Sequence, residues 1–446
     1  MNAPTGPHWT TSQSERHDWA CAQRGWFRRV EGLRASSTPK MRLGTAWHAW
    51  QEALHAYWRR NDGAAPADPV GNRCLACDGT GRVPTADGQG VLVGPGDACP
   101  PCKGTGHSAL LRFEQAEDAA ARAAGSQDYD AAAGARQALA DLVEVWFVTR
   151  GGGAQDPRLR IAAVEGKVYR EVRHPDGRPY RPDVLAVPDP SAAFGYRLAA
   201  TGEARQAGAR VVNWPWYVVG VLDALYVSKT AHPSAVVGEW KVTDSPSSLI
   251  AALGVDPQTS TYAWLVDQPS VLAAIGAERV GGVTVEAMYG GGIYDPAPLK
   301  AGGLSVARNR TVPSWRFQAA QARVIASSGI VTDPTGEHVA WLRVNVDPKL
   351  RVAEPLGLYT PEIGARVAME WWAFVAALTA HRRTAARAPS PAHAQALMPR
   401  TAICRIGGCP FRGPCVADGP EARRNFEAAP PADDPGGYTL DVDGPG

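Results

Sequence analysis

The chain of 446 residues lacks a long hydrophobic run and an excess of charge of either sign. Its most apolar stretch, residues 369–380, is too short to cross a bilayer and contains Glu370, so we expect no membrane partner. Lys plus Arg is 46 and Asp plus Glu is 44, which excludes a polybasic protein that binds phosphates through bulk charge. The first twenty residues do not have the charged start and apolar centre of a secretory signal. We therefore expect a cytoplasmic protein.

Cysteine is also scarce, but the eight cysteines fall into two clusters. Because a cytosolic chain keeps its thiols reduced, such clusters indicate metal ligands rather than disulfides. The first cluster consists of two CxxC pairs, which we call the zinc knuckles: Cys74, Cys77, Cys99 and Cys102. Two CxxC turns supply the four thiolates of a tetrahedral site, so we predict structural Zn²⁺ here, with a redox-active pair as the alternative. The repeated CxxCxGxG pattern resembles the zinc-binding repeat of DnaJ-type chaperones over these residues only.

The second cluster, which we call the cysteine clasp, joins the two ends of the sequence. It consists of one early cysteine and three late ones: Cys21, Cys404, Cys409 and Cys415. Four thiolates can hold either zinc or an iron–sulfur cluster, and their spacing alone does not decide between the two. In either case the metal would tie the termini together, and its binding free energy would become folding free energy.

Two strand-like runs carry charged residues in their interiors. Residues 216–227 are rich in Val, Leu and Tyr but contain Asp223, and residues 235–243 contain Glu239 and Lys241. A carboxylate in a buried strand is costly unless it is paired or bound to a metal. Because alternate side chains share a face of a strand, Glu239 and Lys241 point one way and Trp240 the other. If the two runs pair, Asp223 and Glu239 can meet at one metal ion.

Two predicted helices supply further polar residues. Asp256 followed by Pro257 is a helix start, and Gln258 and Tyr262 then lie on one face at i and i+4. Upstream, Trp and Leu recur at helical spacing over residues 47–58, and His48 lies just beside this apolar stripe.

In this order, His48, Asp223, the Glu239-Trp240-Lys241 tripeptide and Gln258-x3-Tyr262 resemble the motifs of RecB-type nucleases of the PD-(D/E)XK superfamily. The cysteine clasp resembles the iron–sulfur staple of the subgroup that includes the AddB helicase-nucleases and the nucleases of CRISPR adaptation. The resemblance covers about residues 11–60, 160–295 and 400–416. It implies an α/β, restriction-endonuclease-like core with a central mixed sheet flanked by helices.

The sequence departs from this pattern at three places. Four residues separate Cys404 from Cys409 where the family usually has two, and Ala22 replaces a common proline. The zinc knuckles are an insertion that most relatives lack. The first two departures concern the type of metal cluster in the clasp, and they do not touch the predicted catalytic residues.

The resemblance implies a metal-dependent DNA nuclease, and we expect an exonuclease acting in recombination, repair or phage replication, with a helicase or recombination protein as partner. Mg²⁺ or Mn²⁺ would be held by Asp223, Glu239, His48 and the backbone carbonyl of Trp240. Lys241 would orient the attacking water and stabilise the transition state.

Further implied roles concern the helix and the clasp. Gln258 and Tyr262 would position Lys241 or the substrate backbone, and the clasp cysteines would hold a [4Fe-4S] cluster. The alternative from a different class is a non-catalytic nucleic-acid-binding protein on the same scaffold. Glu165 precedes a strand-like run and could assist the site, but it is not one of the predicted site residues.

The predicted organisation has six parts. They are a helical N-terminal region with the first clasp cysteine (1–62), the zinc-knuckle insertion (63–107), a helical connector (108–159), the nuclease core (160–346), a C-terminal helix with the clasp (347–416) and a disordered acidic tail (417–446).

Overall fold

The structure is a computed structural model that describes part of the chain. The described residues are 3–13, 16, 33–35, 39–66, 82–86, 92–98, 139, 142–143, 146, 155–174, 176–200, 203, 208–243, 249, 257–289, 292–294, 297–298, 304–305, 311–313, 351–356, 359–388 and 426–428. All eight cysteines, and therefore both predicted cysteine sites, lie outside these residues.

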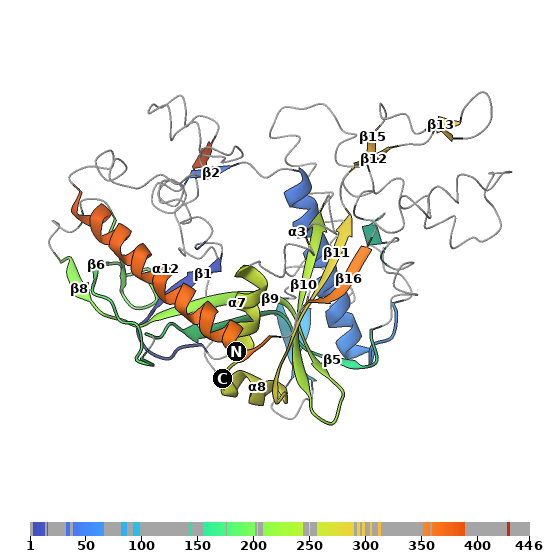
Figure 1. Cartoon of the computed structure of the whole chain (residues 1–446), viewed down its shortest axis with the longest axis horizontal. Coiled ribbons are helices and arrows are strands. Elements are labelled where there is room, and N and C mark those ends of the chain that lie inside the picture. The colour runs from blue at the N-terminus through green and yellow to red at the C-terminus, as the bar shows by residue number, and fades with distance from the viewer. Residues whose placement is uncertain are drawn as a thin grey trace.

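A six-stranded mixed sheet forms the centre of the fold (Figure 1). Its strands are β1 (Trp9–Ser12), β5 (Leu159–Glu171), β9 (Trp216–Ser228), β10 (Ser234–Thr243), β11 (Arg279–Tyr289) and β16 (Arg351–Leu356). The order is β1-β9-β10-β11-β16, and β5 pairs with the other edge of β9. The pairs β1–β9 and β10–β11 are parallel, and the remaining pairs are antiparallel. The predicted α/β class with a central mixed sheet is thus confirmed.

One edge of strand β9 is divided between two partner strands, β1 and β10, and a gap without pairing lies between them. Along its undivided edge, β9 pairs with β5 from Tyr217 to Ser228. Along the divided edge, residues 216–219 of β9 pair with β1, and only residues 224–227 pair with β10. The last backbone pair between β9 and β10 is Ala224–Gly238. The next residues on the two strands, Asp223 and Glu239, lie where the strands separate and are not paired with each other.

Helices cover both faces of the sheet. Helix α3 (Pro39–Arg60) lies on one face, and α7 (Pro257–Val266), α8 (Pro269–Ile275) and α12 (Pro361–Arg387) contribute to the core on the other. Helix α12 packs on α7 (Figure 1), and the indole of Trp371 donates a hydrogen bond of 3.2 Å to Thr261 Oγ1. The predicted helix start at Pro257 is confirmed. Helix α12 starts after Thr360, whose side chain accepts a hydrogen bond from the Ile363 N–H, and continues to Arg387, so the predicted C-terminal helix is present.

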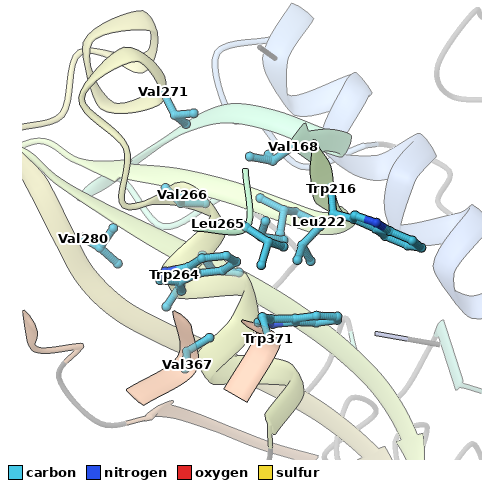
Figure 2. Close-up of a cluster of buried hydrophobic side chains, with 14 of the residues drawn as sticks. Val168, Trp216, Leu222, Trp264, Leu265, Val266, Val271, Val280, Val367 and Trp371 are labelled. Carbon is cyan, nitrogen blue, oxygen red and sulfur yellow. The ribbon is translucent and has the colours of Figure 1, made fainter. Parts of the chain in front are cut away.

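Two buried clusters of apolar side chains hold these layers together. The cluster under α7 and α12 includes Trp216, Trp264 and Trp371 (Figure 2). The cluster under α3 contains the predicted apolar stripe of residues 47–58 and also Trp240. The side chain of Trp240 therefore lies on the α3 face, which confirms that it points away from the face expected for Glu239.

Smaller sheets surround this core. One is the antiparallel sheet β7-β6-β8, formed by Tyr196–Leu198, Val184–Pro188 and Arg210–Val212. The others are the antiparallel pairs β3–β4 (Arg82–Ala86, Leu92–Ala98), β2–β17 (Leu33–Ala35, Phe426–Ala428), β12–β15 (Gly292–Tyr294, Thr311–Pro313) and β13–β14 (Ala297–Pro298, Leu304–Ser305). Strands β1 and β2 show that the N-terminal region is not purely helical. Within the described residues, no helix combines the length and apolar character needed to cross a membrane.

Candidate metal centre

Asp223 and Glu239 lie where β9 and β10 separate. Their residues are 7% and 1% exposed, so both carboxylates are buried. The backbone N–H of Trp240 donates a hydrogen bond of 2.7 Å to Asp223 Oδ2. The Asp223 side chain thus bridges the two strands where the backbone ladder between them has stopped, and it fixes the start of the Glu239-Trp240-Lys241 segment.

Glu239 is held from two directions. Gln258 on α7 donates a hydrogen bond of 2.9 Å to Glu239 Oε1 and also lies 3.1 Å from the hydroxyl of Tyr262. Lys241 forms an ion pair with the same Glu239 oxygen. The other oxygen, Oε2, is buried and has no hydrogen-bond partner among the described residues.

The close approach of α7 depends on a glycine in β9. A Cβ added at Gly220 would lie 2.5 Å from Leu265 Cδ1 and 3.3 Å from the ring of Tyr262. Both of these residues belong to α7. Glycine at position 220 therefore allows the helix to lie close enough to the sheet for Gln258 to reach Glu239.

The charge of Glu239 is unfavourable in this setting. Burial raises the pKa of Glu239 to about 7, and the nearby Asp223 carboxylate adds to this effect, while Lys241 and His48 oppose it. A carboxylate in this position is stabilised by an additional positive charge, such as a cation.

His48 on α3 reaches the same place from the other side. Its Nδ1 atom lies 3.3 Å from Asp223 Oδ1 and 4.0 Å from Glu165 Oε1. Burial by itself lowers the pKa of His48, but the interactions with the Asp223 and Glu165 carboxylates overcome this effect and raise the pKa to about 10. Without a bound ion, the imidazole is thus charged at neutral pH and balances the carboxylates around it.

Glu165, noted from the sequence as a residue that could assist the site but not counted among the predicted site residues, lies beside Asp223. It lies inside β5 rather than before a strand, and its φ angle of 48° is in the left-handed region, which is uncommon for a residue with a side chain. The only signal in the sequence is a carboxylate within the strand-like run of residues 161–168, and exposed strands contain such residues for many reasons. Pairing of β5 with β9 at Val164–Ala224 and Gly166–Leu222 places Glu165 beside Asp223.

A second histidine on α3, His55, supports the site through Trp240, and it was not predicted from the sequence. His55 is buried, and its ring lies 4.6 Å from the ring of Trp240. Its Nδ1 lies 2.8 Å from the carbonyl of Gln51 and its Nε2 2.7 Å from the Tyr226 hydroxyl. Because a carbonyl oxygen can only accept, Nδ1 donates to Gln51, and Nε2 shares a hydrogen bond with the Tyr226 hydroxyl. His55 thereby holds the side chain of Trp240, and the backbone N–H of the same residue donates to Asp223.

The predicted catalytic residues are therefore brought together around the divided edge of β9: His48, Asp223, Glu239, Lys241, Gln258 and Tyr262. Donor atoms of His48, Glu165 and Asp223 all lie within 4.8 Å of one another, which is a spacing that could hold a metal ion. No known protein family, curated protein or solved structure matches the chain.

Proposed function

We propose that this protein is a metal-dependent deoxyribonuclease with a PD-(D/E)XK core of the RecB type, and that it acts as an exonuclease on DNA ends or single strands. The observation that carries the proposal is the pair of buried carboxylates, Asp223 and Glu239, at the separation of β9 and β10 with Lys241 ion-paired to one of them. The motif order of the sequence provides the link to DNA, since the same residues in that order resemble RecB-type nucleases.

The residues fit a hard divalent cation. Asp223 and Glu239 are both buried, burial raises the pKa of Glu239, and Glu239 Oε2 has no partner among the described residues. Carboxylate oxygens with one imidazole nitrogen suit Mg²⁺ or Mn²⁺, and Asp223, Glu239, His48 and the Trp240 carbonyl are the predicted ligands. When bound, the cation would neutralise charge on the phosphate and lower the pKa of a water nucleophile.

The chain's own residues perform the remaining tasks. The Lys241 side chain is 30% exposed, so its ammonium group is accessible to a phosphate while it remains attached to Glu239. From there it can orient the attacking water and stabilise negative charge in the transition state. Gln258 contacts the Glu239 carboxylate, so we assign to Gln258 and Tyr262 the positioning of Glu239 and, through it, of Lys241.

The zinc knuckles are proposed to hold structural Zn²⁺. The register of the β3–β4 hairpin supports this proposal, since Arg82 pairs with Ala98. In the sequence, Arg82 follows Cys77 by five residues and Ala98 directly precedes Cys99, so the paired ends of the hairpin are the ends that adjoin the two CxxC motifs.

The cysteine clasp is proposed to hold a [4Fe-4S] cluster. Strand β2 pairs with β17, so residues after Cys21 lie beside residues after Cys415. In addition, Arg16 forms a 2.8 Å ion pair with Glu370 on α12, which attaches the N-terminal segment to the C-terminal helix. Both contacts support a site that takes ligands from the two ends of the chain.

The test is cleavage of end-labelled linear DNA and of circular DNA in Mg²⁺ or Mn²⁺, comparing the wild type with Lys241→Ala. We expect activity to fall at least about 100-fold in this variant, because one group that stabilises the transition state is lost. Lys229→Ala is the matched control, since this exposed lysine lies at the β9–β10 turn away from the carboxylates, and it should retain full activity.

The outcomes separate the alternatives. Faster loss of linear than of circular DNA supports an exonuclease. Equal activity in wild type and Lys241→Ala contradicts the assignment of the site. Binding of DNA without any cleavage by anaerobically purified protein favours the non-catalytic binding protein. Elemental analysis tests the two cysteine sites, with one zinc and about four irons per chain expected.

A further inference from the structure

The carboxyl end of α7 is held by an arginine of β5. The last carbonyls of a helix have no partners within the helix, and a cation near this end is favourable. The last turn of α7 contains no basic residue of its own. Arg170 takes this place, because its Nη1 atom donates to the carbonyl of Trp264 and, at 2.7 Å, to that of Asp267. Its guanidinium carbon also lies 4.5 Å from the centre of the Trp264 ring.

The other carbonyls at this end of α7 are paired as well. Gln268 Nε2 donates to the carbonyl of Leu265 at 2.6 Å and to the carbonyl of Tyr169 on β5 at 2.9 Å. Backbone N–H groups just after the helix take up two further carbonyls. Two consecutive residues of β5, Tyr169 and Arg170, therefore attach the end of α7 to the sheet.

A junction with α12 holds Arg170 itself in place. Burial lowers the pKa of Arg170, and Tyr359 and Asp267 oppose this effect. The hydroxyl of Tyr359, which directly precedes the start of α12, donates a hydrogen bond of 3.0 Å to Asp267 Oδ2. This hydroxyl lies against Gly364 in the first turn of α12, where an added Cβ would overlap it. The guanidinium is thus enclosed by groups from three elements.

These end contacts fix α7 in a direction that its apolar packing does not. Gly220 sets how closely the helix approaches the sheet, but apolar contacts are non-directional and resist sliding along the helix axis only weakly. Gln258 lies six residues before Trp264, which is about 9 Å along the helix. Its hydrogen bond to Glu239 Oε1 is 2.9 Å long, so a slide of about 1 Å would take it beyond hydrogen-bonding distance.

We propose that Arg170 is a positioning residue of the metal centre: it fixes α7 along the helix axis and so holds Gln258 against Glu239. This inference rests on the proposed function, in which Glu239 binds the cation. The hydrogen bonds of Arg170 are made to the end of α7, so its effect on the cation passes through the helix. Groups that orient a metal ligand in this way contribute about 10- to 100-fold to metal affinity.

The test is titration of the full-length protein with Mn²⁺ at pH 8, without DNA, with the loss of the free Mn²⁺ signal followed by electron paramagnetic resonance. Arg170→Met, which keeps the apolar part of the side chain, should raise the Kd for Mn²⁺ about 10-fold. Partial unfolding would instead lower the number of ions bound and leave the Kd of the folded molecules unchanged. Arg170→Lys keeps a charge and a donor and should recover part of the affinity. In a Gln258→Ala background, Arg170→Met should cause no further loss, because the two residues act in series.

Arg160→Met is the matched control. Arg160 lies on the same strand and donates a hydrogen bond of 2.6 Å to the carbonyl of Ile275 at the end of α8, a helix that carries none of the predicted site residues. This variant loses the same kind of contact and should keep the wild-type Kd.

Three results would overturn the proposal. They are an unchanged Kd in Arg170→Met, an equal rise in Arg160→Met, and an effect of Arg170→Met that adds to that of Gln258→Ala. A wild type that binds no Mn²⁺ would refute the metal centre and this role together. The expected Mn²⁺ affinities without any DNA cleavage would refute the nuclease and leave the role of Arg170 standing.

Discussion

Glu239→Gln should stabilise the protein at pH 8 when no divalent cation is added. The folded protein raises the pKa of Glu239 from 4.5 to about 7, mainly because the carboxyl group is buried. A raised folded-state pKa means that the folded form holds its proton more tightly than the unfolded chain. The contribution of this group to stability is thus fully present below pH 4.5 and is lost as the pH rises through 7.

The magnitude follows from the size of the shift. A difference of about 2.5 pKa units corresponds to about 3 kcal/mol at a pH above both values. Glutamine keeps the volume and the hydrogen-bonding partner Gln258 but loses the ion pair with Lys241. We therefore expect the variant to gain about 1–3 kcal/mol relative to wild type at pH 8.

The assay is urea-induced unfolding followed by tryptophan fluorescence, at pH 4.5 and at pH 8. The buffers contain no added divalent cation and no EDTA, because a chelator would also remove the predicted structural zinc. The advantage of Glu239→Gln should disappear at pH 4.5, where the wild-type carboxyl is protonated. Added Mn²⁺ should stabilise the wild type at pH 8 and the variant much less, since the variant lacks the ligand.

The matched control is Glu278→Gln, which changes a solvent-exposed carboxylate near His232 and should leave this pH dependence unaltered. A variant Glu239→Gln that is less stable than wild type at both pH values would refute the reasoning, because the buried charge would then be favourable even without a cation.

Two further predictions concern neighbouring residues. The carboxylates raise the pKa of His48 to about 10, so Mn²⁺ binding at pH 8 should release close to one proton per chain. Calorimetry in buffers of different ionisation enthalpy measures this release. His48→Ala should abolish it, and an unchanged release in the variant would exclude His48 as a ligand. Gly220→Ala should destabilise the fold by about 1–3 kcal/mol in urea unfolding and weaken Mn²⁺ binding, because the added Cβ would push α7 away from the sheet. The control is Gly44→Ala on α3, where a Cβ meets open space, and it should be neutral or slightly stabilising. Equal effects of the two substitutions would contradict this role for Gly220.

The local parts of the site could be predicted from the sequence. Strand-like runs around Asp223 and Glu239, the helix start at Pro257, and the apolar stripe beside His48 all depend on periodicity and capping within about fifteen residues. The structure bears out these elements and the pairing of β9 with β10. Patterns of this kind are visible because each strand or helix must bury one side.

The parts that were missed depend on pairing between distant segments. Strand β1 is four residues of sequence WTTS, which has no clear alternation, and it becomes a strand because Trp9 packs beside β9. The same holds for Glu165, because a carboxylate in a strand can be recognised as part of a site only when the residue beside it on the next strand is known. That residue is Asp223, 58 positions later, and the register between β5 and β9 is set by the whole length of the two strands.

The separation of β9 from β10 explains why the charged residues are tolerated in the centre of a sheet. Beyond Ala224 the two strands no longer exchange backbone hydrogen bonds, so the N–H of Trp240 needs another acceptor. A buried N–H without one costs about 1–3 kcal/mol, and Asp223 supplies the acceptor. The same separation leaves room in which Glu239, Lys241 and His48 converge. An aliphatic residue at position 223 would leave the Trp240 N–H unpaired, so the Asp223 carboxylate is also part of what holds the two strands in this arrangement.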